Sequence, residues 1–202
     1  MWKGWILLGV LSAALTAFMP SFTGYEIGDT ATDFKLKNVD GKSVSLGDYK
    51  DAKGFILVFD CNTCPYSKAY NSRIIALNDK YVSKGYPLIA INASDNSSPG
   101  ESFDDNINKA KKHSYKFPYL TDETQEIARA YGATNTPHVF VLNRSRQGFR
   151  VAYIGTIDDN ARNPDNVTRR FVEDAVDALL SEKEVPVKKT KAIGCTIKWK
   201  PA

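Results

Sequence analysis

Two cysteines separated by two residues, Cys61 and Cys64, are the part of the chain best suited to chemistry. They directly follow the apolar run 55–59, and a helix is predicted to begin at Pro65. Thiols at this spacing beside the first turn of a helix can close a disulfide, and the positive end of the helix dipole favours the thiolate. The motif therefore predicts a dithiol that works in thiol–disulfide exchange.

The order of the two cysteines predicts different roles for them. Cys61 is expected to be the more exposed and more polarised thiol, and to attack a substrate disulfide. Cys64, one helical turn later, would resolve the mixed disulfide. Asp60 disfavours a thiolate at Cys61 by like-charge repulsion, which favours a reducing couple. The alternative is a static disulfide, which would close too short a loop to constrain the unfolded chain much.

A third cysteine, Cys195, lies near the carboxyl end of the chain. We predict that it is a small buried residue that docks the tail beside Ile193 and Trp199. The alternative is a third redox thiol on a tail that folds back over the dithiol. Four acidic residues are candidates for a carboxylate that moves protons near the buried cysteine, although a solvated role is expected for each: Glu101, Asp122, Glu123 and Glu126.

A metal site is the competing class of function. The C-x-x-C motif could hold copper(I) together with His113 or His138, because soft thiolates suit that ion. A closed zinc site is not expected, since the chain has 2 histidines and no second C-x-x-C. We therefore expect neither a metal nor an organic cofactor to be required.

Strands and helices alternate along the chain after an amino-terminal hairpin over 26–46, whose turn is Asp40-Gly41. Continuous apolar runs predict central strands that are covered on both faces. Segments with an apolar stripe predict the helices that cover them. This order predicts an α/β three-layer sandwich. The predicted strands are 55–59, 87–92, 119–121, 138–142 and 149–154, and the predicted helices are 66–84, 103–112, one between Asp122 and Gly132, and 168–180.

Residues 1–23 are predicted to be a signal peptide or an amino-terminal membrane anchor, because Lys3 precedes an apolar stretch over 6–18. The protein is therefore expected to be exported, either periplasmic or membrane-anchored and facing the periplasm. Residues 24–184 would form one domain and residues 185–202 a lysine-rich tail. The net charge of +4 is mild, and the tail has no arginine or aromatic stripe, so nucleic acid is not an expected partner.

Several segments in this order resemble the redoxin (AhpC/TSA-type) branch of the thioredoxin superfamily. More narrowly, the chain is similar to a group of peroxiredoxin-like proteins with a C-x-x-C motif and a carboxy-terminal Gly-Cys-x-Ile-Lys-Trp signature. The resemblance covers the chain from about Tyr25 to Trp199. It rests on Gly28-Asp29-Thr30-Ala31-x-Asp33-Phe34, Asp40-Gly41-Lys42, Cys61-Asn62-Thr63-Cys64-Pro65-Tyr66, the segment 117–125, Thr136-Pro137 and Gly194-Cys195-Thr196-Ile197-Lys198-Trp199.

The resemblance implies a thioredoxin-like α/β/α sandwich with an amino-terminal β-hairpin extension. It also implies a cis-proline at Pro137 beside the dithiol, with Thr136 offering backbone groups to a bound peptide by strand addition. Alternatively, Pro137 only shapes a turn. His138 follows in the next strand, where alternation turns its side chain away.

At several positions the chain differs from the family pattern, and these differences favour a thiol–disulfide oxidoreductase over a thiol peroxidase. Typical peroxiredoxins carry a threonine or serine where Val58 stands and a proline further upstream, but residues 54–60 contain no proline. The group also usually has histidine at Thr63 and often cysteine at Asn135. We therefore expect a thiol–disulfide oxidoreductase that reduces protein disulfides with electrons from an upstream dithiol protein. A thiol peroxidase acting on hydrogen peroxide or alkyl hydroperoxides is the alternative.

Overall fold

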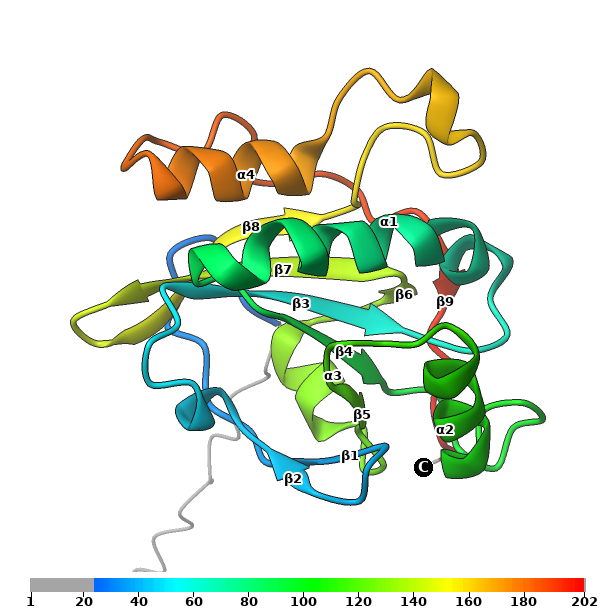
Figure 1. Cartoon of the computed structure of the whole chain (residues 1–202). Helices are drawn as coiled ribbons and strands as arrows, with labels where there is room; N and C mark the ends of the chain where they lie inside the picture. The colour runs from blue at the N-terminus through cyan, green and yellow to red at the C-terminus, as the bar shows by residue number, and fades with distance from the viewer. Residues whose placement is uncertain (1–23, 202) are drawn as a thin grey trace, which may run out of the picture.

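The computed structural model describes residues 24–201, so the predicted signal or anchor over residues 1–23 lies outside the described residues. Its centre is a mixed seven-stranded sheet (Figure 1). In spatial order the strands are β2 (Ser43–Val44), β1 (Leu36–Asn38), β5 (Tyr119–Thr121), β4 (Leu88–Asn92), β3 (Gly54–Asp60), β7 (His138–Ser145) and β8 (Gly148–Gly155). Strands β3, β4 and β5 are parallel, and the other pairings are antiparallel.

The central strand β3 is buried along its whole length. Ile56 and Val58 point into one hydrophobic cluster, and Phe55, Leu57 and Phe59 point into another on the opposite face. Strands β4 and β7 alternate in the same way. A strand covered on both faces needs an unbroken apolar run, which is why these segments could be identified in the sequence.

Helices cover both faces of this sheet (Figure 1). Helices α1 (Pro65–Tyr81) and α4 (Phe171–Leu180) pack on the face of Ile56 and Val58, and α3 (Glu126–Tyr131) packs on the other face. Helix α2 (Phe103–Lys112) lies against β5. The predicted three-layer α/β/α sandwich is confirmed. None of the helices within residues 24–201 is both long enough and apolar enough to cross a membrane.

Two predicted elements are cut short in the structure by hydrogen bonds to side chains. The hairpin strands are limited to β1 and β2, because the Asp33 carboxylate accepts hydrogen bonds from the backbone N–H groups of Phe34 and Leu46 and holds this chain as a loop. Helix α4 begins at Phe171 rather than Thr168, whose backbone N–H binds the Asp159 carboxylate. Side-chain hydrogen bonds of this kind compete with regular secondary structure.

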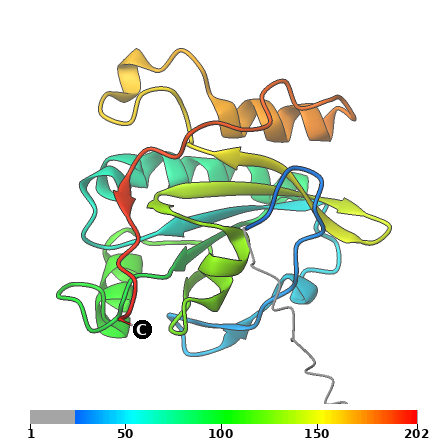
Figure 2. The same ribbon diagram turned by 180° about the vertical axis from the view of Figure 1, so that it is seen from behind.

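The carboxy-terminal segment after α4 runs back across the molecule (Figure 2). Val185 joins the core beside α4, and the backbone N–H of Thr190 donates to the carbonyl of Ile154 in β8. The segment then forms β9 (Cys195–Thr196), which pairs antiparallel with β6 (Asn135–Thr136). The tail is therefore held against the domain.

Candidate active site

The C-x-x-C loop joins the end of β3 to the start of α1. Helix α1 begins at Pro65, and Cys64 is its N-cap residue. Both cysteines are free thiols, and their exposures are 4% for Cys61 and 3% for Cys64. The two thiols are thus buried to nearly the same extent, and exposure does not separate them. The dipole of α1 also acts first on Cys64, since Cys64 is the residue at the helix terminus.

Thr136 and the predicted cis-proline Pro137 lie against the two thiols. The Thr136–Pro137 peptide bond is cis. The Cys61 Sγ lies 3.2 Å from the Thr136 Oγ1, and the Cys64 Sγ lies 3.1 Å from the Thr136 carbonyl oxygen. The structure thus brings together four residues that the sequence placed about seventy positions apart.

The Glu101 side chain binds the C-x-x-C loop through hydrogen bonds. Its carboxylate is 1% exposed and accepts hydrogen bonds from the backbone N–H groups of Asn62 and Thr63, both at 3.0 Å. It also accepts bonds from the Thr63 hydroxyl at 2.5 Å and from the Asn92 amide at 3.0 Å. Glu101 was one of four carboxylate candidates, but its role as the clamp of this loop could not be read from its position in a polar loop.

An ion pair supports the other side of the loop. The Lys109 ammonium group of α2 lies 2.5 Å from the Asp60 carboxylate and donates to the Cys61 carbonyl at 2.8 Å. Both side chains are nearly covered, with exposures of 9% for Lys109 and 2% for Asp60. The predicted repulsion between Asp60 and a Cys61 thiolate is therefore partly offset by a cation that the sequence did not reveal.

The two thiols share a hydrogen bond, and this bond sets where the negative charge lies. The hydrogen bond from Cys61 lowers the pKa of Cys64 to about 4, and further hydrogen bonds from Cys195 and the Ser67 backbone act in the same direction against the effect of burial. The bond to Cys64 and burial raise the pKa of Cys61, and the charges of Glu101 and Asp60 add to the rise. In the reduced protein these effects favour the thiolate on Cys64 over a thiolate on Cys61.

This assignment predicts an unusual pH titration. Reduced protein is expected to carry a thiolate at Cys64 from about pH 5 upward, because the proton is lost above a pKa of about 4. Cys61→Ala removes the largest cause of this lowering, so the thiolate should then appear at a pKa closer to that of an ordinary thiol, about 8.5. The ultraviolet absorbance of the thiolate during a pH titration measures both. Cys64→Ser is the control that loses the acidic step, and a wild-type titration near 8.5 would contradict the assignment.

Cys195 reaches the same site from the tail. Its Sγ lies 2.7 Å from the Cys64 Sγ. The residue is partly exposed, and burial, followed by the hydrogen bond to Cys64, raises its pKa to about 11. Cys195 is therefore half-buried rather than buried, and its neighbour Ile193 is 39% exposed. Ile197, which is 2% exposed, and Trp199, which packs against the core, hold the tail in place.

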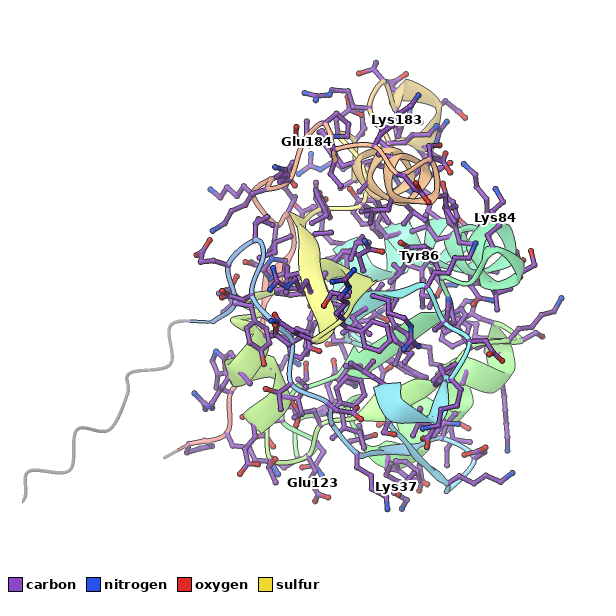
Figure 3. All side chains as sticks on the ribbon, turned by 90° about the vertical axis from the view of Figure 1, so that its left-hand side faces the viewer. Lys37, Lys84, Tyr86, Glu123, Lys183 and Glu184 are labelled. Carbon is purple, nitrogen blue, oxygen red and sulfur yellow. The ribbon has the colours of Figure 1, made fainter. Side chains whose placement is uncertain are left out.

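The remaining candidates lie outside this cluster. Asp122 is buried but accepts the backbone N–H of Ala128 and so caps the start of α3. Glu123 and Glu126 are exposed, and Figure 3 shows Glu123 at the outer surface. Burial lowers the pKa of His138 to about 4, and its Nδ1 accepts the backbone N–H of Thr134.

Metal binding finds no further support in the geometry. His113 ends α2 and stacks on Tyr115. Within residues 24–201, no group of three or more histidine, cysteine, aspartate or glutamate side chains is arranged to hold a metal ion.

Comparison with known proteins places the chain among redox proteins. A family model described as the AhpC/TSA family matches residues 27–157. The thiol-disulfide oxidoreductase ResA of Bacillus cereus is 30% identical over 149 residues, which cover 69% of this chain and 79% of that protein.

Two solved structures show the same fold. The crystal structure of a conserved protein from Geobacillus kaustophilus has 37% identity and a TM-score of 0.80, covering 88% of this chain and 94% of the other. The exposed lipoprotein thioredoxin Etrx1 from Streptococcus pneumoniae has 24% identity and a TM-score of 0.54, covering 75% and 99%. The predicted thioredoxin-like fold class is thereby confirmed.

Proposed function

We propose that this chain, which belongs to the AhpC/TSA family, is a thiol–disulfide oxidoreductase whose Cys61–Cys64 dithiol reduces disulfides in other proteins. The sequence resemblance to the redoxin branch of the thioredoxin superfamily is confirmed by the family match and by the thioredoxin-like fold. The observation that carries the proposal is that both thiols converge on Thr136, directly before the cis-proline Pro137.

The chemistry needs only the two sulfurs. The proton in the Cys61–Cys64 hydrogen bond moves to Cys64, and the Cys61 sulfur attacks a substrate disulfide. One substrate sulfur leaves as a thiolate and takes a proton, while the other stays in a mixed disulfide with Cys61. The Cys64 sulfur then attacks Cys61, which releases the second substrate thiol and leaves a Cys61–Cys64 disulfide. An upstream dithiol protein returns two electrons and two protons.

The choice of Cys61 as the attacking sulfur is supported by the contacts of the pair. Cys64 already has a second sulfur neighbour in Cys195. The Cys61 Sγ is instead placed to accept hydrogen bonds from the backbone N–H of Cys64 at 3.3 Å and from the Thr136 hydroxyl at 3.2 Å. These two donors would stabilise a transient thiolate on Cys61.

Substrate recognition is proposed to use the backbone of Thr136. An extended peptide that adds to β6 gains main-chain hydrogen bonds and brings a disulfide over the thiols. The pairing of β6 with β9 supports this, because an extended strand already fits at this edge, and a substrate strand would take the place of β9 there (Figure 1). Specificity for particular proteins would then come from side chains around the strand rather than from a deep pocket.

A peroxidase is the second candidate, favoured by the family match and by the low pKa of Cys64. In that reaction the Cys64 thiolate attacks the peroxide O–O bond, which gives a sulfenic acid and releases water or an alcohol. Cys61 then condenses with the sulfenic acid, which releases water and forms the same disulfide.

The location of the protein is proposed from its amino-terminal sequence. A positive start followed by an apolar core over 6–18 supports export, with the catalytic domain periplasmic or tethered to the membrane. The similarity to an exposed lipoprotein thioredoxin is consistent with an extracytoplasmic redox role.

A paired turnover assay tests the proposal. One arm follows the reduction of insulin disulfides driven by dithiothreitol, and the other follows consumption of hydrogen peroxide, with the Cys61→Ser/Cys64→Ser double variant as the blank. Turnover of insulin alone supports the reductase. Faster consumption of peroxide supports the peroxidase instead. The reductase also predicts a redox potential nearer to about −270 mV than to about −120 mV on equilibration with glutathione.

A further inference from the structure

We propose that Cys195 is a third redox thiol of this site, and that Cys64 forms a disulfide alternately with Cys61 and with Cys195. This inference rests on the proposed function, because it assumes that the Cys61–Cys64 disulfide is a working intermediate. It assigns to the tail a chemical role that goes beyond holding it against the domain.

The backbone of the tail presents Cys195 to the dithiol. Strand β9 pairs antiparallel with β6 in a register that sets Cys195 opposite Thr136. Thr136 is the residue whose hydroxyl contacts Cys61 and whose carbonyl contacts Cys64. The tail therefore occupies the strand position proposed for a substrate, with its cysteine at the register of the reactive sulfurs.

The sulfur atoms are close enough for exchange. The Cys64 Sγ and Cys195 Sγ lie 2.7 Å apart, compared with about 2.05 Å in a formed disulfide. Only a small movement is needed to form the bond. Cys64 is thus in contact with a thiol on each side, one within its own loop and one on the tail.

The tail is fixed on both sides of Cys195. Before it, the Asn135 amide donates to the Gly194 carbonyl at 3.0 Å. After it, Ile197 is buried, and its backbone N–H donates to the Thr134 carbonyl at 3.0 Å. Further along, the Lys198 carbonyl accepts the backbone N–H of Asp95 at 2.7 Å. A thiol held in this way has a much higher effective concentration than one on a free tail.

Gly194 makes the close approach of the tail achievable. A Cβ atom at this position would lie 2.1 Å from the Thr136 carbonyl oxygen, which is backbone and cannot easily give way. Any other residue at this position would push β9 away from β6. The pairing of β9 with β6, which brings the Cys195 thiol to the site, therefore requires glycine at position 194.

The exchange step conserves atoms and electrons. The Cys195 sulfur, on losing its proton, attacks the Cys64 sulfur of the Cys61–Cys64 disulfide. The bond between Cys61 and Cys64 breaks, the bond between Cys64 and Cys195 forms, and the electron pair leaves on Cys61, which takes up the proton. One disulfide and one thiol are present before and after the step. Cys61 is returned to its thiol form, and the oxidised pair now includes the tail.

Peptide mapping tests this directly on the full chain. Trypsin leaves Cys61 and Cys64 together in the peptide 54–68 and Cys195 in the peptide 192–198. After oxidation by glutathione disulfide, alkylation and digestion without reductant, wild-type protein should yield these two peptides joined by a disulfide. In Cys61→Ser, Cys195 is the remaining disulfide partner of Cys64, so the joined peptides should be the main product. This variant is the control that shows that the joined peptides can be detected. A wild-type digest without them overturns the proposal.

A second variant tests the strand pairing. Gly194→Val should slow formation of the Cys64–Cys195 bond by about a hundredfold, the order expected when reacting groups are misplaced by an ångström. Cys195→Ser is the matched control that cannot form the bond. An unchanged rate in Gly194→Val would contradict the role given to β9.

The outcomes separate this inference from the proposed function. If the protein reduces insulin but the joined peptides are not found, the reductase proposal is supported and the redox role of Cys195 is contradicted. The joined peptide without turnover of insulin leaves the three-thiol exchange standing and removes the reductase.

Discussion

Cys61→Ser is expected to lower the rate of insulin-disulfide reduction by roughly a thousandfold or more, the scale seen when a catalytic nucleophile is removed. Serine is nearly isosteric with cysteine, but its hydroxyl does not ionise near neutral pH and so cannot attack a disulfide. Cys64 would remain, with the Cys195 sulfur of the tail as its neighbour. The measurement is the initial rate with dithiothreitol as electron donor.

Cys64→Ser should have an equally low rate for a different reason. Cys61 can still attack, but no cysteine within the loop can resolve the mixed disulfide. The variant should therefore accumulate a covalent complex with a disulfide-containing protein, visible on a non-reducing gel and removed by reductant. Cys61→Ser is the matched control and should form little of it.

The trapping result also decides the order of the two cysteines. Accumulation in Cys61→Ser, with none in Cys64→Ser, would mean that Cys64 makes the first attack. That outcome would contradict the mechanism proposed above and would agree with the resting position of the thiolate on Cys64.

Glu101→Ala is expected to lower the free energy of unfolding by about 3 to 4 kcal/mol, because several buried donors lose a charged acceptor. The carboxylate accepts four hydrogen bonds, three of them from Asn62 and Thr63 between the two cysteines and one from Asn92. Without it, the buried part of this loop must bind water or rearrange. Denaturant unfolding of the variant and the wild type measures the loss as a lower midpoint with an unchanged m value.

Glu123→Ala is the control for this prediction. Glu123 is exposed and accepts one hydrogen bond, from the Asn96 amide at 3.2 Å, so its removal should change stability by less than about 0.5 kcal/mol. A loss below about 1 kcal/mol in Glu101→Ala would show that Glu101 does not clamp the loop. Glu101→Gln should lie between the two, because its amide keeps the shape but brings a donor toward other donors.

Much of the fold could be predicted because its signals are local. The apolar runs of β3, β4 and β7 follow from burial on both faces of one sheet, and this pattern needs no knowledge of the neighbouring strands. The helix predicted over 66–84 likewise ends where Gly85 has a φ of 91°. The hairpin was overestimated, since the hydrogen bonds of Asp33 to residues far along the chain leave no trace in the alternation of its neighbours.

The candidate site was predicted only where its residues carry their own chemistry. Cys61 and Cys64 are marked by their spacing, and Pro137 by the resemblance to the redoxin branch. The residues that support them are ordinary polar side chains in sequence. Glu101 is one acid in a polar loop and Lys109 one of several lysines in α2, and nothing in their spacing from the cysteines indicates a contact.

The sequence by itself determined the class of chemistry, because a C-x-x-C at a helix start is a short-range pattern with a direct physical meaning. The tertiary structure decided how that chemistry is arranged. It gave Cys64 rather than Cys61 the hydrogen bonds that lower a thiol pKa, and it brought Cys195 to Thr136 across 59 positions of chain. Strand pairing between distant segments depends on the whole fold, so local patterns cannot encode which residues meet or which sulfur holds the charge.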